Sequence, residues 1–381
     1  MTECDVLIIG GGPAGATLAW ALRRQGREVH LLDKARYPRD KVCAGWITPA
    51  VISELELDLE DYARDQLLQP VHGFRVSLMG GREIEADYHG EPISYGIRRC
   101  EFDHYLLRRS GAVIHEGVAV KSIERDGDGY LVNGEYRCRL LVGAGGHFCP
   151  VARHVFGARP GAGELAVRAQ EIEFRMSPAQ ARDCPVDPQM PELFFCEDLK
   201  GYGWVVRKGD YLNIGLGRED NHRLAEHVKR FCEALAEAGK IPAALPGRFQ
   251  GHAYLLYPHA RRELVRDGAM LVGDAAGLAY PQSGEGIRPA IESALIAAAV
   301  IGACEGAYPA SALVAYAEKL QAHLGTREQR TFTDRLPEWL VRFLGQKLLG
   351  MRWFIRHMVM DRWFLHRQTP PLRMDGAMSQ D

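Results

Sequence analysis

Near the start of the chain, three glycines follow an apolar run at a fixed spacing. The segment VLIIGGGPAG at residues 6–15 places Gly10, Gly12 and Gly15 in the order G-x-G-x-x-G directly after β-branched residues. The next run, ATLAWALRRQ, favours a helix, and a second apolar run, REVHLLD, ends at Asp33. This order of strand, glycine-rich turn, helix and acid-terminated strand predicts a dinucleotide-binding βαβ unit. A turn without a ligand is the alternative interpretation.

The residues of this unit have different physical tasks. Gly10 allows the tight turn out of the strand, Gly12 lets the backbone approach a pyrophosphate, and Gly15 permits close packing of helix on strand. The phosphates are expected at the helix N-terminus, where unpaired N–H groups favour negative charge. Asp33 is placed to accept a hydrogen bond from a ribose hydroxyl. The cofactor-binding residues predicted here are Gly10, Gly12, Pro13, Ala14, Gly15, Asp33 and Lys34.

A second strand-to-helix turn lies far along the chain. Residues 269–277, AMLVGDAAG, lead into Pro281 and the helix-forming run GIRPAIESALIAAAVIG. This segment resembles the second flavin motif of FAD-dependent oxidoreductases of the p-hydroxybenzoate hydroxylase type. The resemblance implies that Asp274 binds the ribityl chain and that the helix, from about Gly284, points its N-terminus at the isoalloxazine pyrimidine ring, where it stabilises negative charge on reduced flavin. It assigns to FAD the residues Gly273, Asp274, Gly284, Gly286 and Ile287. A turn with no ligand is the alternative.

Two further segments bear on the same superfamily. Arg99 begins the run RCEFDHYLLRR, which resembles an R-x-x-F-D-x-x-L helix start whose Arg approaches the cofactor. The alternative interpretation, given equal weight, is that Arg99 is a surface charge and Asp103 an acid at a helix N-terminus. The run LLVGAGGHFCPVAR at 140–153 has Gly145 and Cys149 where many relatives have Asp and Ser. The carboxylate contact of those relatives therefore has no counterpart at Gly145.

The most discriminating stretch is GYGWVVRKG at 201–209, followed by DYLNIGLG. It resembles the Y-x-W-x-F-P-K-G…G-x-G signature of the geranylgeranyl reductase family, which saturates isoprenoid double bonds with reduced FAD. The matching positions are Tyr202, Trp204, Lys208, Gly209, Gly215 and Gly217, whereas Val206 and Arg207 replace the usual Phe-Pro. Packing on one face of a core strand is the alternative explanation for the aromatic pair.

Catalytic roles are predicted for Cys43, Tyr202 and Trp204. Tyr202 and Trp204 fall on one face of a strand, because side chains alternate with a period of two, and that face is expected to border the substrate. Cys43 falls where the family has a Cys-Gly segment near the flavin. Its thiol is expected to tune or protonate the substrate, with structural burial as the alternative.

The two flavin motifs sit at opposite ends of the sequence, so the cofactor domain must be discontinuous. We expect an α/β fold in which residues 1–64, 98–160 and 255–330 form a Rossmann-like FAD-binding domain. Residues 65–97 and 161–254 contain the strand-like runs FRVSLM, LAVRAQEIEF, ELFFCED and YLNIGLG, and are expected to form an antiparallel substrate-binding sheet over the flavin. Residues 331–370 are expected to form C-terminal helices.

Composition excludes several classes of protein. With 46% hydrophobic and 25% charged residues among 381, the chain is ordinary globular material, and a net charge of −2 gives no electrostatic reason to expect nucleic acid. Nine cysteines without a C-x-x-C pair favour a reducing cytoplasm and no zinc or other metal site. The first strand follows Met1 almost at once, so no signal peptide is expected.

The tail from 336 to 366 carries three tryptophans, at 339, 353 and 363, among Phe, Leu, Met and basic residues at helical spacing. Amphipathic helices packed on the core are one interpretation. The other is a helix that lies in the headgroup region of a membrane or lines the entry of an apolar substrate, which would make the protein peripheral at the inner membrane face.

The sequence therefore predicts an FAD-dependent oxidoreductase of the geranylgeranyl reductase-like group that reduces carbon–carbon double bonds of an isoprenoid or other apolar lipid. No second G-x-G-x-x-G marks a separate NAD(P) domain, so the expected electron donor is NADPH that binds transiently, a ferredoxin or a flavodoxin. The alternatives are a flavin monooxygenase that hydroxylates aromatic substrates, a flavin halogenase, and a quinone-linked electron-transfer flavoprotein. The W-x-W-x-I-P motif of halogenases is absent around Trp204.

Overall fold

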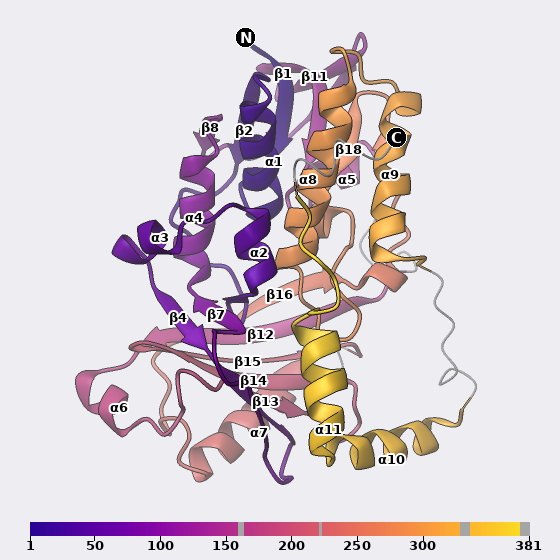
Figure 1. Cartoon of the computed structure of the whole chain (residues 1–381). Helices are drawn as coiled ribbons and strands as arrows, with labels where there is room; N and C mark the ends of the chain where they lie inside the picture. Colours follow the sequence, from indigo (N-terminus) through magenta and orange to yellow (C-terminus); the bar gives the residue numbers. More distant parts are fainter. Residues whose placement is uncertain (159–163, 221–222, 328–335, 374–381) are drawn as a thin grey trace.

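Two large sheets, stacked one above the other in Figure 1, organise the chain. The computed structural model describes residues 1–158, 164–220, 223–327 and 336–373. The expected domain boundaries at 160/161 and 330/331 lie outside these residues. The α/β class is confirmed, with parallel and antiparallel sheets and helices at the C-terminal end.

The first sheet is mainly parallel and has the strand order β17-β18-β11-β1-β2-β8. Its central strand β1 (Thr2–Ile9) pairs in parallel with β2 and β11 and is buried from Cys4 onward. The other strands are β2 (Val29–Asp33), β8 (Val113–Glu116), β11 (Tyr136–Gly143), β17 (Val265–Arg266) and β18 (Ala269–Leu271), extended by β9 (Ile123–Asp126) and β10 (Gly129–Val132).

Helices α1 (Pro13–Arg24) and α8 (Ile287–Ala303) lie side by side against this sheet, although they are far apart in the sequence (Figure 1). Gly15 makes the packing of α1 possible, because a Cβ at this position would lie 1.9 Å from the carbonyl oxygen of Gly10. The remaining helices of this half are α2 (Pro49–Glu54), α3 (Leu59–Asp65), α4 (Arg99–Arg109), α5 (Pro150–His154) and α9 (Ala310–Leu324).

The second sheet has the order β16-β12-β15-β14-β13-β5-β6 and contains all the strand-like runs expected for it. It is antiparallel except for the parallel pair β13–β5, where a segment from early in the chain joins the sheet. Its strands are β5 (Gly73–Leu78), β6 (Ile84–Asp87), β12 (Ala166–Arg175), β13 (Glu192–Phe195), β14 (Gly201–Lys208), β15 (Tyr211–Arg218) and β16 (Gln250–Leu255). Helices α6 (Pro178–Asp183) and α7 (Leu224–Glu237) accompany it, and β3 (Trp46–Ile47), β4 (Leu68–Val71) and β7 (Ser94–Ile97) form a small third sheet.

The C-terminal segment forms α10 (Glu338–Leu349), the short helix α11 (Arg352–Phe354) and a π-helix, η4 (Ile355–Phe364). One side of η4 packs into a buried apolar cluster with residues of the second sheet, among them Phe74 and Trp204. The chain then runs back toward the first half, where Arg288 of α8 donates to the carbonyl oxygens of Thr369 and Pro370. None of the helices in the described residues is long and apolar enough to cross a membrane.

Candidate active site

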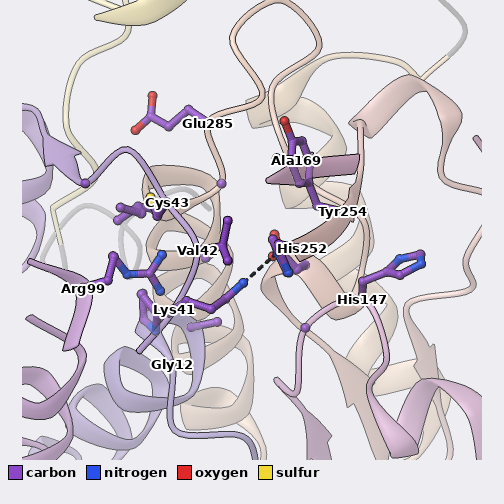
Figure 2. A pocket seen from close by; sticks show the side chains of 18 of the residues that line it. Gly12, Lys41, Val42, Cys43, Arg99, His147, Ala169, His252, Tyr254 and Glu285 are labelled. Atoms are coloured by element: carbon purple, nitrogen blue, oxygen red, sulfur yellow. Dashed lines mark hydrogen bonds and ion pairs between the residues drawn. The ribbon is translucent and has the colours of Figure 1, made fainter. Parts of the chain in front are cut away.

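A cavity of about 410 Å³ lies where the two large sheets meet (Figure 2). It brings together residues from the two predicted flavin motifs and from the second sheet. The predicted site residues that line it are Gly10, Gly12, Pro13, Ala14, Asp33, Lys34, Cys43, Arg99, Tyr202, Trp204, Asp274, Gly284, Gly286 and Ile287. Gly15 and Gly273 are not in the lining; both are buried beside it.

The turn before α1 leaves room for a ligand at one position. Gly12 is the N-cap of α1. In the described part of the chain, and apart from its sequence neighbours, a Cβ at Gly12 would have one atom within 4 Å, Nη2 of Arg39 at 3.6 Å. Nη1 of Arg39 is buried and has no hydrogen-bond partner among the residues that the structure describes. An unpaired guanidinium N–H beside an open helix N-terminus suits a phosphate group, so this end of the cavity fits the pyrophosphate of FAD. Sequence reasoning missed Arg39, because no spacing rule links it to the glycine motif.

Asp33 ends β2 and holds the turn together. Its carboxylate accepts hydrogen bonds from the backbone N–H of Gly11 at 2.7 Å and of Ala35 at 2.8 Å, and from the Tyr37 hydroxyl at 3.1 Å. A carboxylate has about four acceptor sites, so one remains for a ribose hydroxyl. Asp33 therefore stabilises the glycine turn as well as facing the cavity.

Arg99 begins α4 and is buried, which excludes the surface-charge interpretation of this residue. Its guanidinium makes two 2.9 Å hydrogen bonds to the carboxylate of Asp103, which is fully buried and also pairs with Arg39 at 3.1 Å. Burial alone would lower the pKa of Arg99, but Asp103 and the neighbouring Cys43 raise the pKa to a greater extent. The Arg99 guanidinium therefore stays protonated beside the Cys43 thiol, with its charge balanced by Asp103.

Sequence reasoning also missed a chain of polar groups across the cavity. Figure 2 shows Lys41 pointing at His252, with 2.7 Å between Nζ and Nε2, and the same Nε2 lies 3.7 Å from Oδ2 of Asp274. Burial lowers the pKa of Lys41 to about 8, against the attraction of Asp274. Burial alone would raise the pKa of Asp274, but His252 and Lys41 lower it by more than burial raises it. The pKa is therefore below its ordinary value, and the carboxylate stays ionised. Lys41 comes from the loop after β2 and His252 from β16, so only the fold brings them together.

The predicted helix start near Gly284 is wrong by three residues. Gly284 has φ +68 and Gly286 is the N-cap, so α8 begins at Ile287. A Cβ at Gly286 would come within 3.0 Å of Oδ1 of Asp274, so the glycine lets the helix N-terminus approach that carboxylate. Glu285 lies between the two glycines, and burial raises its pKa to about 8.

Tyr202 and Trp204 share one face of β14, as expected, with 6.0 Å between ring centroids. The Tyr202 hydroxyl donates to the carbonyl oxygen of Ser283 at 2.5 Å, which links the second sheet to the loop before α8. Trp204 is only 6% exposed, and its Nε1 donates to Oδ1 of Asn213 at 2.7 Å. Gly215 leaves the space that the indole fills, because a Cβ there would lie 2.2 Å from the ring. Trp204 thus has a packing role as well as a place in the cavity wall.

The loop that carries Cys43 is held by buried polar groups of the second sheet. The N–H of Cys43 donates to Glu171 at 2.5 Å, and its carbonyl oxygen accepts from Asn213 at 3.1 Å. Lys208 is fully buried and donates to the carbonyl oxygen of Ala44 at 3.1 Å. Burial raises the pKa of Glu171 to about 8, opposed mainly by Lys208. Lys208, a family-matching position in the sequence, therefore supports the Cys43 loop.

Comparisons with known proteins agree with this geometry. Residues 3–330 match the family model described as FAD binding domain. The chain is 30% identical over 320 residues to menaquinone reductase of Mycobacterium tuberculosis, covering 78% of this chain and 76% of that protein. It is 29% identical over 353 residues to digeranylgeranylglycerophospholipid reductase 1 of Methanothermobacter thermautotrophicus, covering 85% and 84%.

Solved structures share the fold at low sequence identity. A geranylgeranyl bacteriochlorophyll reductase-like protein from Thermoplasma acidophilum superposes with a TM-score of 0.71 at 20% identity, covering all of this chain and 92% of that one. The flavin-dependent brominase Bmp2 gives 0.70 at 19% identity, with 100% and 95% covered. Because the family match spans most of the chain, the chain belongs to the FAD-binding domain family, as a flavoprotein oxidoreductase of the geranylgeranyl reductase-like group.

Proposed function

We propose that this protein uses bound FAD to reduce carbon–carbon double bonds in an isoprenoid or similarly apolar lipid. The observation that carries the proposal is the aromatic wall opposite the phosphate end of the cavity, formed by Trp46, Tyr202 and Trp204 with Val42 and Ala44 beside them. Such a surface binds an apolar chain and offers few polar groups to a hydrophilic substrate. The names of the two relatives, which denote reductases of lipids with isoprenoid chains, support the same substrate class.

Each end of the cavity has a task in this reaction. The open turn at Gly12 and the unpaired Nη1 of Arg39 would hold the pyrophosphate, and Asp274 the ribityl chain. The N-terminus of α8 would stabilise negative charge on the pyrimidine ring. Reduced FAD, when bound, supplies a hydride. The aromatic wall would orient the apolar substrate and exclude water from it.

Cys43 is the proposed proton donor to the carbon next to the one that receives the hydride. Its thiol lines the cavity beside Arg99, and its backbone is fixed at both ends by Glu171 and Asn213. A fixed donor of this kind contributes about 10²- to 10⁴-fold to a rate. We expect Cys43→Ala to retain FAD while the reduced flavin is reoxidised by substrate more slowly by that factor.

The finer assignments belong to the same proposal. The electron donor is NADPH, a ferredoxin or a flavodoxin, and the protein works in the cytoplasm, at the inner face of a membrane that holds its substrate. The FAD-binding domain comprises 1–64, 98–160 and 255–330, and the substrate domain 65–97 and 161–254. The pairing of β5 and β6 with β12–β16 in one sheet supports this division.

The test is a single turnover without oxygen. Enzyme reduced chemically under anaerobic conditions should convert a polyprenyl lipid to a product with one double bond fewer, while the flavin absorbance returns to the oxidised form. A monooxygenase cannot react without oxygen. A product that forms only when oxygen is admitted, and that carries a new hydroxyl, would overturn the proposal in favour of a hydroxylase.

A further inference from the structure

Large apolar side chains are concentrated on the outside of one segment near the C-terminus. In the part of the chain that the structure describes, six of the eleven exposed large hydrophobic residues lie within residues 339–353. These six residues, here called the α10 surface, are Trp339, Phe343, Leu344, Leu348, Met351 and Trp353. Trp339 is 65% exposed and Trp353 is 63% exposed. Apolar side chains gathered this way on the outside of a protein mark an interaction site.

The surface faces outward because the other side of α10 is fixed to the protein. Gly345 packs closely on Leu199, since a Cβ at this position would lie 2.5 Å from Cδ1 of that leucine. Gln346 donates to the carbonyl oxygen of Glu197 at 2.8 Å, and Leu349 is buried in the cluster that contains Trp204. In Figure 1, α10 lies at the edge of the molecule, beyond the second sheet. Because α10 is packed on the protein, the exposure of these side chains is not explained by a helix that has failed to dock.

The charges around the α10 surface are positive. Arg342, Lys347 and Arg352 are exposed, and Nζ of Lys347 lies 5.7 Å from the centroid of the Phe343 ring. The one acid in this segment, Glu338, pairs with Lys200 at 2.9 Å. Tryptophan and phenylalanine next to lysine and arginine are typical of a helix that lies in the headgroup region of an anionic bilayer.

The same charges disfavour a second copy of this chain as the occupant. In a two-fold symmetric dimer the surface would face its own image, so the cations of one copy would meet those of the other. No unpaired carboxylate within the segment 338–353 is available to compensate them. An anionic lipid surface offers the opposite charge and an apolar interior below it.

The α10 surface is also connected to the cavity through one apolar cluster. Phe364, at the end of η4, packs edge-on against Tyr202 with 5.4 Å between centroids, and its ring lies 6.3 Å from that of Trp46. Both partners line the cavity, and Leu349 of α10 belongs to the same cluster. A membrane bound at α10 would therefore lie on the side of the molecule that builds the aromatic wall.

We propose that the α10 surface docks the protein on anionic lipid bilayers, with Trp339, Phe343 and Trp353 inserted at headgroup level. The link from docking to substrate delivery rests on the proposed function, because only a lipid substrate would be drawn from the bilayer. Docking itself needs no turnover, so it is tested with vesicles that contain no isoprenoid lipid.

The experiment is flotation of the FAD-loaded, full-length protein with vesicles of phosphatidylcholine containing phosphatidylglycerol. The wild type should float with these vesicles. The double variant Trp339→Ser/Trp353→Ser should bind at least about tenfold more weakly, because two large apolar groups no longer enter the bilayer. Vesicles carrying brominated acyl chains should quench the wild-type tryptophan fluorescence and leave that of the double variant unchanged.

A matched control removes exposed apolar side chains elsewhere. Val113→Ser/Val314→Ser changes two exposed valines of β8 and α9 and should leave flotation unchanged. FAD absorbance and the melting temperature of both double variants should equal those of the wild type, which excludes unfolding as the cause. Equal flotation of the tryptophan variant and the wild type, or no flotation of the wild type, would overturn the proposal.

Charge and self-association give two further outcomes. Replacing Arg342, Lys347 and Arg352 by glutamine should weaken binding about fivefold for each cation removed, and salt should weaken the wild type in the same way. If the tryptophan variant instead turns a dimer into a monomer in light scattering, the α10 surface is a protein interface and the proposal is wrong. If vesicles bind but no double bond is reduced, the proposed function fails and the docking surface stands.

Discussion

The phosphate end of the cavity is made largely of backbone from one continuous segment, whereas its aromatic end is made of side chains from segments far apart in the sequence. At the first end, the turn from Gly10 to Ala14 and the acid at Asp33 come from a single βαβ unit. At the second, Trp46 belongs to β3, Tyr202 and Trp204 to β14, and Phe364 packs behind them from η4. The backbone geometry of the first end can be inferred from the spacing of glycines in the sequence. The aromatic end cannot be inferred in this way, because its side chains come together only in the tertiary fold.

Because of this difference, the two ends of the cavity should differ in how strongly a single substitution affects them. A backbone site depends on a few positions where any Cβ changes the available space, so one substitution there can abolish binding. A side-chain wall spreads its contribution over many contacts, each of modest size. Substitutions at the phosphate end should therefore have large effects on FAD binding, and those at the aromatic end smaller effects on turnover.

The largest effect is expected for Gly12→Val. A side chain at Gly12 would meet almost no protein atoms but would fill the position proposed for the pyrophosphate. The clash with FAD should cost about 3 kcal/mol or more, so affinity should fall by more than about a hundredfold while the flavin-free protein remains folded. Flavin absorbance after purification and thermal melting of the apoprotein measure the two quantities.

Gly15→Val is the matched control, because its Cβ would overlap the carbonyl oxygen of Gly10 within the protein itself. This variant should lose the folded state rather than only the cofactor. A Gly12→Val protein that stays fully yellow would show that the phosphates bind elsewhere and would break the comparison between the two ends.

The next effect concerns Asp274, at the middle of the cavity. Its side chain is 22% exposed, so removing it should not unfold the protein. Loss of a charge-assisted hydrogen bond costs about 1.5–3 kcal/mol, so Asp274→Ala should weaken FAD binding by roughly ten- to a hundredfold in titrations of the apoprotein. Asp274→Asn, which keeps one acceptor, should lose less. Equal affinity in all three proteins would make the GDAAG turn purely structural.

A smaller effect is expected from the titration of Lys41. In the flavin-free protein its pKa of about 8 lies below the ordinary 10.5, so the unfolded chain binds more protons between these values. The free energy of unfolding of the apoprotein should therefore rise with pH from about 8 to 10.5. FAD affinity should change in the opposite direction, falling about tenfold between pH 7 and 9, because a neutral lysine no longer attracts the anionic cofactor.

Lys41→Met should flatten both pH profiles. His252 contacts Lys41 directly, and the charged or titratable groups around it are Asp274, Arg99, Cys43 and Asp103. Burial lowers the pKa of His252, and Asp274 stays ionised, so neither explains a transition near pH 8. Profiles that keep their shape in the methionine variant would assign the transition to another group.

The sequence predicted the parts of the molecule that depend on local pattern. The βαβ unit, the strand before the GDAAG turn, the α8 helix and the strands of the second sheet all follow from apolar periodicity and glycine positions. It did not identify Arg39, Lys41, His252 or Asn213, which act through contacts between remote segments. It also placed the start of α8 too early, because the left-handed backbone at Gly284 follows from the loop conformation and not from helix propensity.

The smallest effect is expected for Trp204→Phe. This variant tests whether Trp204, through Asn213, helps to position the Cys43 loop. Trp204→Phe removes the 2.7 Å hydrogen bond to Asn213, which itself donates to the carbonyl oxygen of Cys43 at 3.1 Å. We expect the free energy of unfolding to fall by about 1 kcal/mol, and the rate of flavin reoxidation by substrate to fall about fivefold, because the Cys43 loop is held less tightly. FAD content should not change. Tyr202→Phe, which loses only its bond to Ser283, should leave the reoxidation rate within about twofold of the wild type. Equal rates for both variants would show that Trp204 acts by packing alone and that Asn213 does not position Cys43.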